Sequence, residues 1–328
     1  MDELLGVDSG SYCVQPVHVY IDLATIIGFM KRDQYQIAME SLINAKDVNT
    51  IALEIINVVG HYRNYFKSIT DSGNYQLKVF LIYGENNEFA MDEGFAWNKE
   101  RSEKMNEVYG EERAKRLSRM IDFAMEKRVK EVLRYSRDTY VITSDKFDRS
   151  IIPAYIEHSI KEEEVQPLSV FITNAPIFLQ FPINNPKSII LQPSGQYSKT
   201  ITRSNIKSYL TDSYKTSKVE SVDSKFILDY LALTGCGKML EPLTTEIKGV
   251  KLLNFLAQND IDNHAGIDKV SLEKYRNCIA YYKILPKILP EDLMEIDSQI
   301  AMRRSSFNTM LEFNEEFFQG NLSLNFFS

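Results

Sequence analysis

Residues Phe226 to Leu256 read FILDYLALTGCGKMLEPLTTEIKGVKLLNFL, and this stretch is the most informative about the fold. It begins with an apolar run, continues through a polar segment opened by Gly235, and returns to an apolar run near Ile247. Asp223 or Ser224 can cap the first run, because short polar side chains accept hydrogen bonds from the first amides of a helix. The stretch therefore predicts two helices joined by a polar turn.

The N-terminal half alternates β-rich runs with helical patterns. A β-rich run at residues 17–22 (VHVYID) ends in a carboxylate and precedes a helical pattern from Leu23 to about Arg32. Further strands are expected at residues 77–83, 140–143, 169–173 and 188–191, with helices around residues 51–59 and 150–163. Strands separated by helical crossovers favour a mostly parallel α/β sheet. After about residue 220 the sequence predicts helices only.

Composition sets the outer limits of the interpretation. The 328 residues are 44% hydrophobic and 25% charged, as in an ordinary globular protein of one large or two modest domains. A formal charge of −7 argues against a generic nucleic-acid coat but is compatible with a local basic groove. The three cysteines lack metal-ligand spacing, so a reducing intracellular compartment is expected. No secretion signal and no membrane partner are expected, since no apolar run approaches the roughly 20 residues of a membrane span.

The helical stretch resembles the helix–three-turn–helix of the flap endonuclease / 5′-nuclease family, whose pattern continues as ALxGDxxDNIPGVxGIGxKTAxxLL. The positions in register are Ala232, Leu233, Gly235, Pro242, Ile247, Phe255 and Leu256. The two metal-binding aspartates of that motif fall at Cys236 and Met239. The two glycines that flank its isoleucine fall at Glu246 and Lys248. The resemblance implies a retained scaffold with an altered site.

The resemblance extends into the first two strands. In the family, the first strand ends in a metal-binding aspartate, and Asp22 matches it. The aspartate that ends the second strand falls at Tyr83, with Glu85 two residues further on. The family's Tyr-Lys-x-x-Arg signature is represented by WNKER at residues 97–101.

Two later acidic motifs of the family are largely replaced here. The acidic cluster that opens a helix falls at residues 146–149 (KFDR), where Asp148 is retained. The two aspartates that follow the next strand fall at Ala175 and Ile177, although the Leu-Gln after them is kept. The resemblance covers nearly the whole chain after residue 15, and the order and spacing of the motifs are more specific than any one of them.

The resemblance implies a PIN-like α/β domain over residues 1–220, with a mostly parallel sheet flanked by helices and a helical arch region at about 98–137. It implies a C-terminal helical domain over residues 221–328 that contains a degenerate helix–three-turn–helix.

Two-metal phosphodiester hydrolysis needs several carboxylates to hold two cations about 4 Å apart. Asp22 and Asp148 are the aligned carboxylates that remain, and they are the residual catalytic candidates. A reduced metal site could draw further on Glu85 and Asp145. We therefore expect no cofactor and no catalytic residue, with Mg²⁺ or Mn²⁺ as the cofactor if residual nuclease activity survives.

Two basic residues stand where the family has carboxylates. Lys146 and Arg149 carry the charge of the missing cations, so they are candidates to neutralise Asp22 and Asp148 directly. An ion pair in an unrelated protein would have the same appearance in the sequence.

The turn of the helical stretch is one candidate for nucleic-acid contact. Lys248 and Lys251 are its candidate binding residues, but Glu246 places a negative side chain beside the expected phosphate. Glycines allow close approach of backbone amides to a phosphate, and here they are lost. The alternative is a plain helical hairpin that keeps only its apolar contacts.

The arch region is the second candidate. Residues 99–137 contain twelve basic and eight acidic side chains, an excess of four positive charges. The candidate binding residues here are Lys99, Arg101, Arg113, Lys115, Arg116 and Arg119. In active members of the family the arch guides a single strand toward the metals. The alternative is a solvated helix held by i,i+4 pairs such as Glu112–Arg116 and Glu126–Lys130.

Three functional hypotheses follow. The first is a catalytically degenerate 5′-nuclease-like protein, or pseudoenzyme, that serves as a non-enzymatic, nucleic-acid-associated component of a phage or viral assembly. The second is an active, divergent metal-dependent 5′–3′ exonuclease or flap endonuclease with a reduced metal site. The third is an architectural protein without nucleic-acid contact. The candidate partners are single-stranded or branched DNA and other proteins, and the expected location is the host cytoplasm or the virion.

The surroundings of Asp22 discriminate between the first two hypotheses. A cation held there by three or more carboxylates favours the enzyme, whereas a lysine or arginine at the same place favours the degenerate site.

Overall fold

The structure is a computed structural model that describes residues 14–28, 36–71, 73–84, 106–144, 149–160, 165–193, 199–214, 227, 290–291 and 293–302. Its first elements, up to the second long strand, are β1 (Gln15–Asp22), α2 (Leu23–Ile26), β2 (Ile27–Gly28), β3 (Ile37–Ala38), α3 (Met39–Ile43), α4 (Val48–Thr70) and β4 (Tyr75–Gly84). The next are α7 (Glu111–Ala124), the π-helical η1 (Met125–Val129), α8 (Lys130–Leu133), β5 (Thr139–Ser144) and α9 (Ile151–His158). The last are β6 (Leu168–Ile172), the 3₁₀ turn η2 (Pro176–Leu179), α10 (Gln180–Asn184), β7 (Ser188–Gln192), β8 (Lys199–Ile201) and α11 (Ile206–Tyr214). Residues 293–302 form one further helix.

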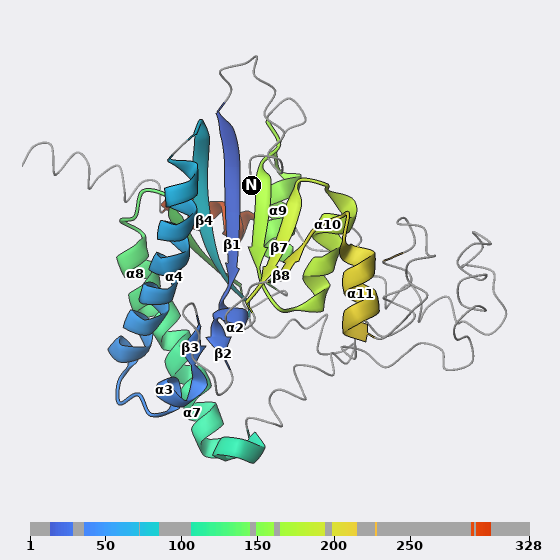
Figure 1. The fold of residues 1–328 in the computed structure, drawn as a ribbon. Coiled ribbons are helices and arrows are strands. Elements are labelled where there is room, and N and C mark those ends of the chain that lie inside the picture. Colours follow the sequence, from blue (N-terminus) through green and yellow to red (C-terminus); the bar gives the residue numbers. More distant parts are fainter. Residues whose placement is uncertain are drawn as a thin grey trace, which may run out of the picture.

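Six strands form one sheet in the order β5-β4-β1-β6-β7-β8 (Figure 1). The first five of these strands in that order pair in parallel, and β8 pairs with β7 in the antiparallel sense. The predicted α/β fold, a mostly parallel sheet flanked by helices, is therefore confirmed. In a parallel sheet the carboxyl ends of neighbouring strands meet at one edge, which places the end of β1 beside the end of β4.

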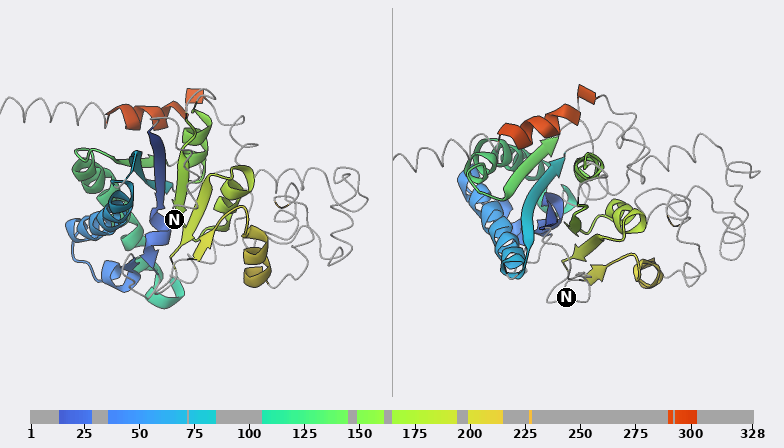
Figure 2. Two further views of the ribbon diagram at one scale, coloured as in Figure 1. Left: turned by 45° about the horizontal axis from the view of Figure 1, so that its top comes forward. Right: turned by 90° about the horizontal axis from the view of Figure 1, so that it is seen from above.

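The helical layers cover opposite faces of the sheet because successive residues of a strand point to opposite sides. From β1, Val19 and Ile21 join the apolar core that contains the inner faces of α4 and α7. On the other face, Tyr20 stacks between Phe80 and Phe171 at centroid distances of 5.0 and 5.1 Å. Figure 2 shows α4 and α9 on opposite sides of the strands.

Some predicted boundaries are wrong. The helix expected from Leu23 to about Arg32 ends at Ile26, because Ile27 begins a short strand that pairs with Ile37 of β3. The helix expected to reach residue 163 ends at His158. The short strand β8 was not predicted, since three residues are too few to show an alternating pattern.

Several sequence predictions lie outside the described residues. They include the helix–three-turn–helix with Cys236, Met239, Lys248 and Lys251, the arch candidates Lys99 and Arg101, and Glu85, Asp145, Lys146 and Asp148. Of residues 221–289 the structure describes Ile227 alone, so the C-terminal helical domain stays a prediction. Among the described helices, none combines the length and the apolar character that a membrane crossing requires.

Candidate functional site

Asp22 lies at the carboxyl end of the central strand β1, as the sequence predicted, and is fully buried. It also caps helix α2, since its Oδ1 accepts a hydrogen bond from the Ala24 amide at 3.1 Å. A carboxylate at an N-cap satisfies an amide that the helix leaves without an internal partner. The local sequence thus fixes the Asp22 side chain at the edge where the parallel strands end.

Both oxygens of the Asp22 carboxylate are fully engaged. Besides the Ala24 amide, Oδ1 accepts from Arg149 Nε at 2.6 Å. The other oxygen, Oδ2, accepts from the hydroxyls of Thr25 at 3.0 Å and Thr173 at 2.9 Å. A carboxylate offers about four acceptor positions, and four donors occupy them here.

The Arg149–Asp22 pair is buried, with side-chain exposures of 6% and 1%. Removing a charge from water is costly, and a buried ion survives when a partner and additional hydrogen bonds compensate it. The Arg149 guanidinium supplies the positive charge that compensates the buried Asp22 carboxylate. The sequence-based idea that Arg149 neutralises a retained aspartate is realised for Asp22.

Gly84, the last residue of strand β4, lies close to the backbone of Arg149. A Cβ added to Gly84 would lie 2.8 Å from the Arg149 amide nitrogen and 3.0 Å from its Cα. Such distances are too short for two non-bonded heavy atoms, so the missing side chain of Gly84 creates the room in which Arg149 sits.

The other replaced positions have acquired structural roles. Tyr83, at the end of β4, donates its hydroxyl hydrogen to Asp122 of α7 in a short contact, which ties the sheet edge to that helix. Ile177 is buried in the core next to the aromatic residues of η2 and α10. The Ala175 amide donates to the Thr173 hydroxyl at 3.0 Å and thereby helps to orient the hydroxyl that donates to Asp22.

The described residues near Asp22 do not fit a divalent cation. Within the part of the chain that the structure describes, no three His, Cys, Asp or Glu side chains come together. Mg²⁺ needs a full shell of hard oxygen ligands, and the oxygens of Asp22 already accept hydrogen bonds. The further metal candidates Glu85, Asp145 and Asp148 lie outside the described residues.

Helix α7 lies at the same end of the sheet as α2, which Asp22 caps (Figure 1). Its inner face is buried through Leu117, Ile121 and Ala124 and packs against α4. The segment 111–133 is therefore a packed layer of the fold and keeps one solvated face. The predicted Glu126–Lys130 pair forms at 2.7 Å.

The charges on α7 differ in detail from the expectation. Instead of the expected Glu112–Arg116 pair, Glu111 pairs with Lys115 at 2.5 Å, and Arg116 Nη2 reaches the Ala45 carbonyl at 3.4 Å. The hydrogen bond and charge of Lys115 lower the pKa of Glu111, and Glu111 raises the pKa of Lys115 in the same way.

The solvated face of α7 borders a shallow groove of about 340 Å³. Its lining residues are Val48, Glu112, Lys115, Arg116, Arg119, Met120 and Phe123. The predicted residues Lys115, Arg116 and Arg119 are thus brought together, while Arg113 is exposed outside this lining. Arg119 makes no hydrogen bond or ion pair with another described residue.

Phe123 is the member of this groove that sequence reasoning missed. Its side chain is 52% exposed, an unusual state for a large aromatic residue. The signal was present in the spacing, because Lys115, Arg119 and Phe123 recur every four residues and so share one face of a helix.

No family model matches the chain, and no curated protein matches it. Among solved structures, the chain is similar to the T5 D15 protein, which was co-crystallised with metal ions. The similarity has a TM-score of 0.43 and 11% sequence identity, and it covers 90% of this chain and 98% of that chain. So distant a likeness assigns no function, and the proposal below rests on this chain's own residues.

Proposed function

We propose that this chain is a non-hydrolytic protein with a 5′-nuclease-like α/β domain, which binds nucleic acid on the basic face of α7 without cutting it. One observation carries the first part of the proposal: Arg149 Nε lies 2.6 Å from Asp22 Oδ1 in a buried pair. The role is that of a non-enzymatic component of a nucleic-acid-handling assembly, and a phage or viral origin is part of the proposal.

An arginine can replace the charge of a cation but cannot replace its chemistry. In two-metal hydrolysis the ions generate a hydroxide from bound water and clamp the attacking and leaving oxygens. A guanidinium binds no water as a metal does, and its pKa above about 12 prevents it from acting as a base. Arg149, the Ala24 amide and the Thr25 and Thr173 hydroxyls together occupy the acceptor positions of Asp22 that a cation would need. We therefore propose that the buried Arg149–Asp22 pair, together with the other replaced carboxylates, keeps the fold without hydrolysis.

The groove on α7 has the side chains that single strands require. Proteins that bind single-stranded nucleic acid combine a basic groove along the backbone with exposed aromatic rings on which bases stack. Here Lys115, Arg116 and Arg119 supply three positive charges against Glu112 of the lining and Glu111, which pairs with Lys115 at 2.5 Å, and Phe123 supplies the exposed ring. Single-stranded DNA, free or as an arm of a branched structure, is therefore the proposed ligand.

The test is a titration of labelled single-stranded and 5′-flap DNA, followed by fluorescence anisotropy at several salt concentrations. The variant Lys115→Gln/Arg116→Gln/Arg119→Gln removes three charges from the groove. The control Lys187→Gln/Lys199→Gln/Arg203→Gln removes three exposed charges from the β7–β8 side of the molecule.

The groove variant is expected to weaken binding and to reduce the slope of log affinity against log salt by about two to three, because each lost phosphate contact removes 0.7 to 0.9. The control is expected to keep the slope of the native chain. Equal losses in both variants would place binding elsewhere, and no binding at any salt concentration would favour the architectural alternative.

A further inference from the structure

The helix at residues 293–302 lies against the outer edge of β5 (Figure 2). Its Gln299 carboxamide makes two hydrogen bonds with the backbone of one residue, Thr143. The Thr143 amide donates to Gln299 Oε1 at 3.0 Å, and Gln299 Nε2 donates to the Thr143 carbonyl at 2.8 Å. The side chain thus pairs with Thr143 as the peptide group of a neighbouring strand would.

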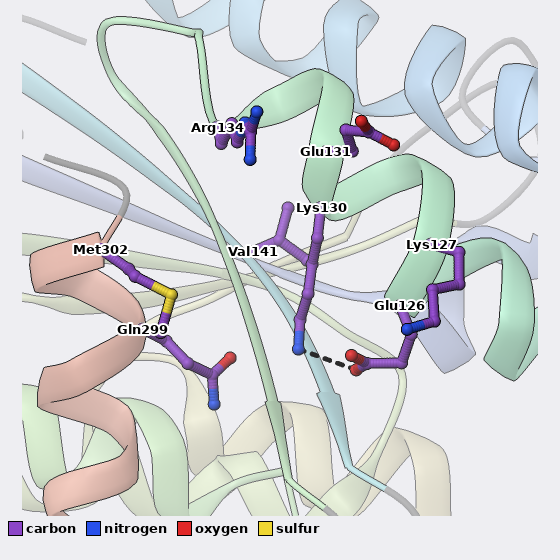
Figure 3. Close-up of a pocket in the computed structure, with 8 residues that line it drawn as sticks. All are labelled: Glu126, Lys127, Lys130, Glu131, Arg134, Val141, Gln299 and Met302. Carbon is purple, nitrogen blue, oxygen red and sulfur yellow. Dashed lines mark hydrogen bonds and ion pairs between the residues drawn. The ribbon is translucent and has the colours of Figure 1, made fainter. Parts of the chain in front are cut away.

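This pairing matters because β5 is an edge strand. An edge strand presents amide and carbonyl groups that no neighbouring strand satisfies. The hydroxyl of Thr143 is also occupied, since it accepts from Lys130 Nζ and donates to Glu126 at 3.0 Å. Figure 3 shows Gln299 facing Lys130 and Glu126. The hollow between them has a volume of about 460 Å³ and is also lined by Val141 of β5. The carboxyl end of β5 is therefore held from both sides.

The same helix makes a second polar contact, with α9. The Tyr155 hydroxyl donates to Asp297 at 2.8 Å, and burial together with this hydrogen bond raises the pKa of Tyr155. Ile296, which directly precedes Asp297, is fully buried. The helix is consequently anchored to two different elements of the α/β domain.

These two elements flank Arg149 in the sequence. Strand β5 ends at Ser144, five residues before Arg149, and α9 begins at Ile151, two residues after it. The α9 anchor lies close to Arg149, because α9 begins two residues after it, so a displacement of α9 is expected to move the Arg149 backbone. The helix at 293–302 therefore contacts the element that precedes Arg149 in the sequence, β5, and the element that follows it, α9.

We propose that this helix is a latch that keeps Arg149 on Asp22. The inference rests on the buried pair and not on nucleic-acid binding. The described part of the helix is little buried: Ile296 is its one fully buried side chain, and Met294 and Met302 are 63% and 65% exposed. Elements with so few buried contacts open at low cost. Undocking the helix is then the route by which a change near the C-terminal end of the chain reaches the Asp22 site.

Hydrogen exchange in the full chain tests the latch. The observables are the Thr143 amide, the amides of the first turn of α9 and the Arg149 Nε–H, followed by NMR. The variant Asp297→Ala/Gln299→Ala removes both polar anchors. The control Ser298→Ala changes an exposed position of the same helix. If the double variant fails to fold, Gln299→Glu serves instead, since a carboxylate keeps the acceptor for the Thr143 amide and loses the donor for its carbonyl.

The latch variants are expected to accelerate exchange at all three places by about fivefold or more, the effect of losing a hydrogen bond worth about 1 kcal/mol. The control is expected to leave all three unchanged. Faster exchange at Thr143 with unchanged exchange at Arg149 Nε–H would show that the helix only covers the edge of β5, and it would overturn the proposal. Unchanged exchange everywhere would overturn it as well.

Discussion

Asp22 and Arg149 form a buried ion pair at the carboxyl end of the central strand. The family resemblance places the cluster of acidic ligands at residues 146–149, and Arg149 comes from that cluster. Its guanidinium reaches the retained aspartate at 2.6 Å in the buried interior. The negative charge that a cation would balance is balanced inside the chain, so the fold tolerates Asp22 without a bound ion.

The pair yields a stability prediction. Arg149→Gln leaves the buried Asp22 carboxylate without its counter-charge and is expected to lower the free energy of unfolding by about 3–5 kcal/mol. The double variant Asp22→Asn/Arg149→Gln removes both charges and is expected to recover a large part of that loss. Chemical denaturation of the two single variants and the double variant gives the coupling energy. Additive losses would show that the two side chains do not stabilise each other.

A second prediction concerns Gly84, whose missing side chain makes room for Arg149. In Gly84→Ala the new Cβ would lie 2.8 Å from the Arg149 amide nitrogen. Backbone atoms cannot yield as a flexible side chain does, so the free energy of unfolding is expected to fall by about 1–3 kcal/mol.

Gly60→Ala is the matched control, because Gly60 is helical and its Cβ would meet no atom within 4 Å. That change is expected to raise stability by about 0.5–1 kcal/mol, the usual gain of alanine over glycine in a helix. Equal effects of the two substitutions would contradict the close approach at Gly84.

At the scale of elements, the sequence predicted the strands well and the contacts between distant elements poorly. A β-rich run that ends in an aspartate was enough to place Asp22 at the end of β1. Nothing in the sequence pairs Thr173 with that aspartate, because a hydroxyl contact across 151 positions leaves no periodic signal. The same holds for Gln299 and Thr143, which lie 156 positions apart.

Helix α7 shows both results together. The sequence predicted a charged helical segment here, but charge counting alone could not show which basic residues share a groove or that Leu117 and Ile121 are buried. Arg113 was grouped with Lys115, Arg116 and Arg119, but it lies outside the groove lining. The helical spacing assigns Phe123 to the groove in its place.

The groove leads to a prediction that separates stacking from charge. Phe123→Ala is expected to weaken single-stranded DNA binding by about 1–3 kcal/mol, the contribution of one base stacked on an aromatic ring, with the salt slope unchanged. Arg119→Gln is expected to reduce the salt slope by about one. Anisotropy titrations over a salt series report both quantities.

Leu53→Ala is the control for the first change, since Leu53 is also apolar and is 58% exposed, but lies on α4 outside the groove lining. An equal loss of affinity in the Leu53 and Phe123 variants would exclude a specific stacking role for Phe123.

For the whole molecule, the predicted α/β fold with a mostly parallel sheet is present, and its central strand places Asp22 at the edge where the parallel strands end. The helix–three-turn–helix that first suggested the family lies outside the described residues, so that part of the account stays a prediction. The central claim concerns the described part of the chain: Arg149 is paired with Asp22, and on this ground we propose that the site does not hydrolyse phosphodiesters.

The most direct measurement of that claim is a cleavage assay. Labelled 5′-flap, duplex and single-stranded DNA are incubated with the purified chain in Mg²⁺ or Mn²⁺, beside the Asp22→Ala variant prepared in the same way. We predict no cleavage above background with either metal and no difference between the two proteins. Cleavage by the native chain that disappears in Asp22→Ala would contradict the account, because a contaminating nuclease would not depend on that residue.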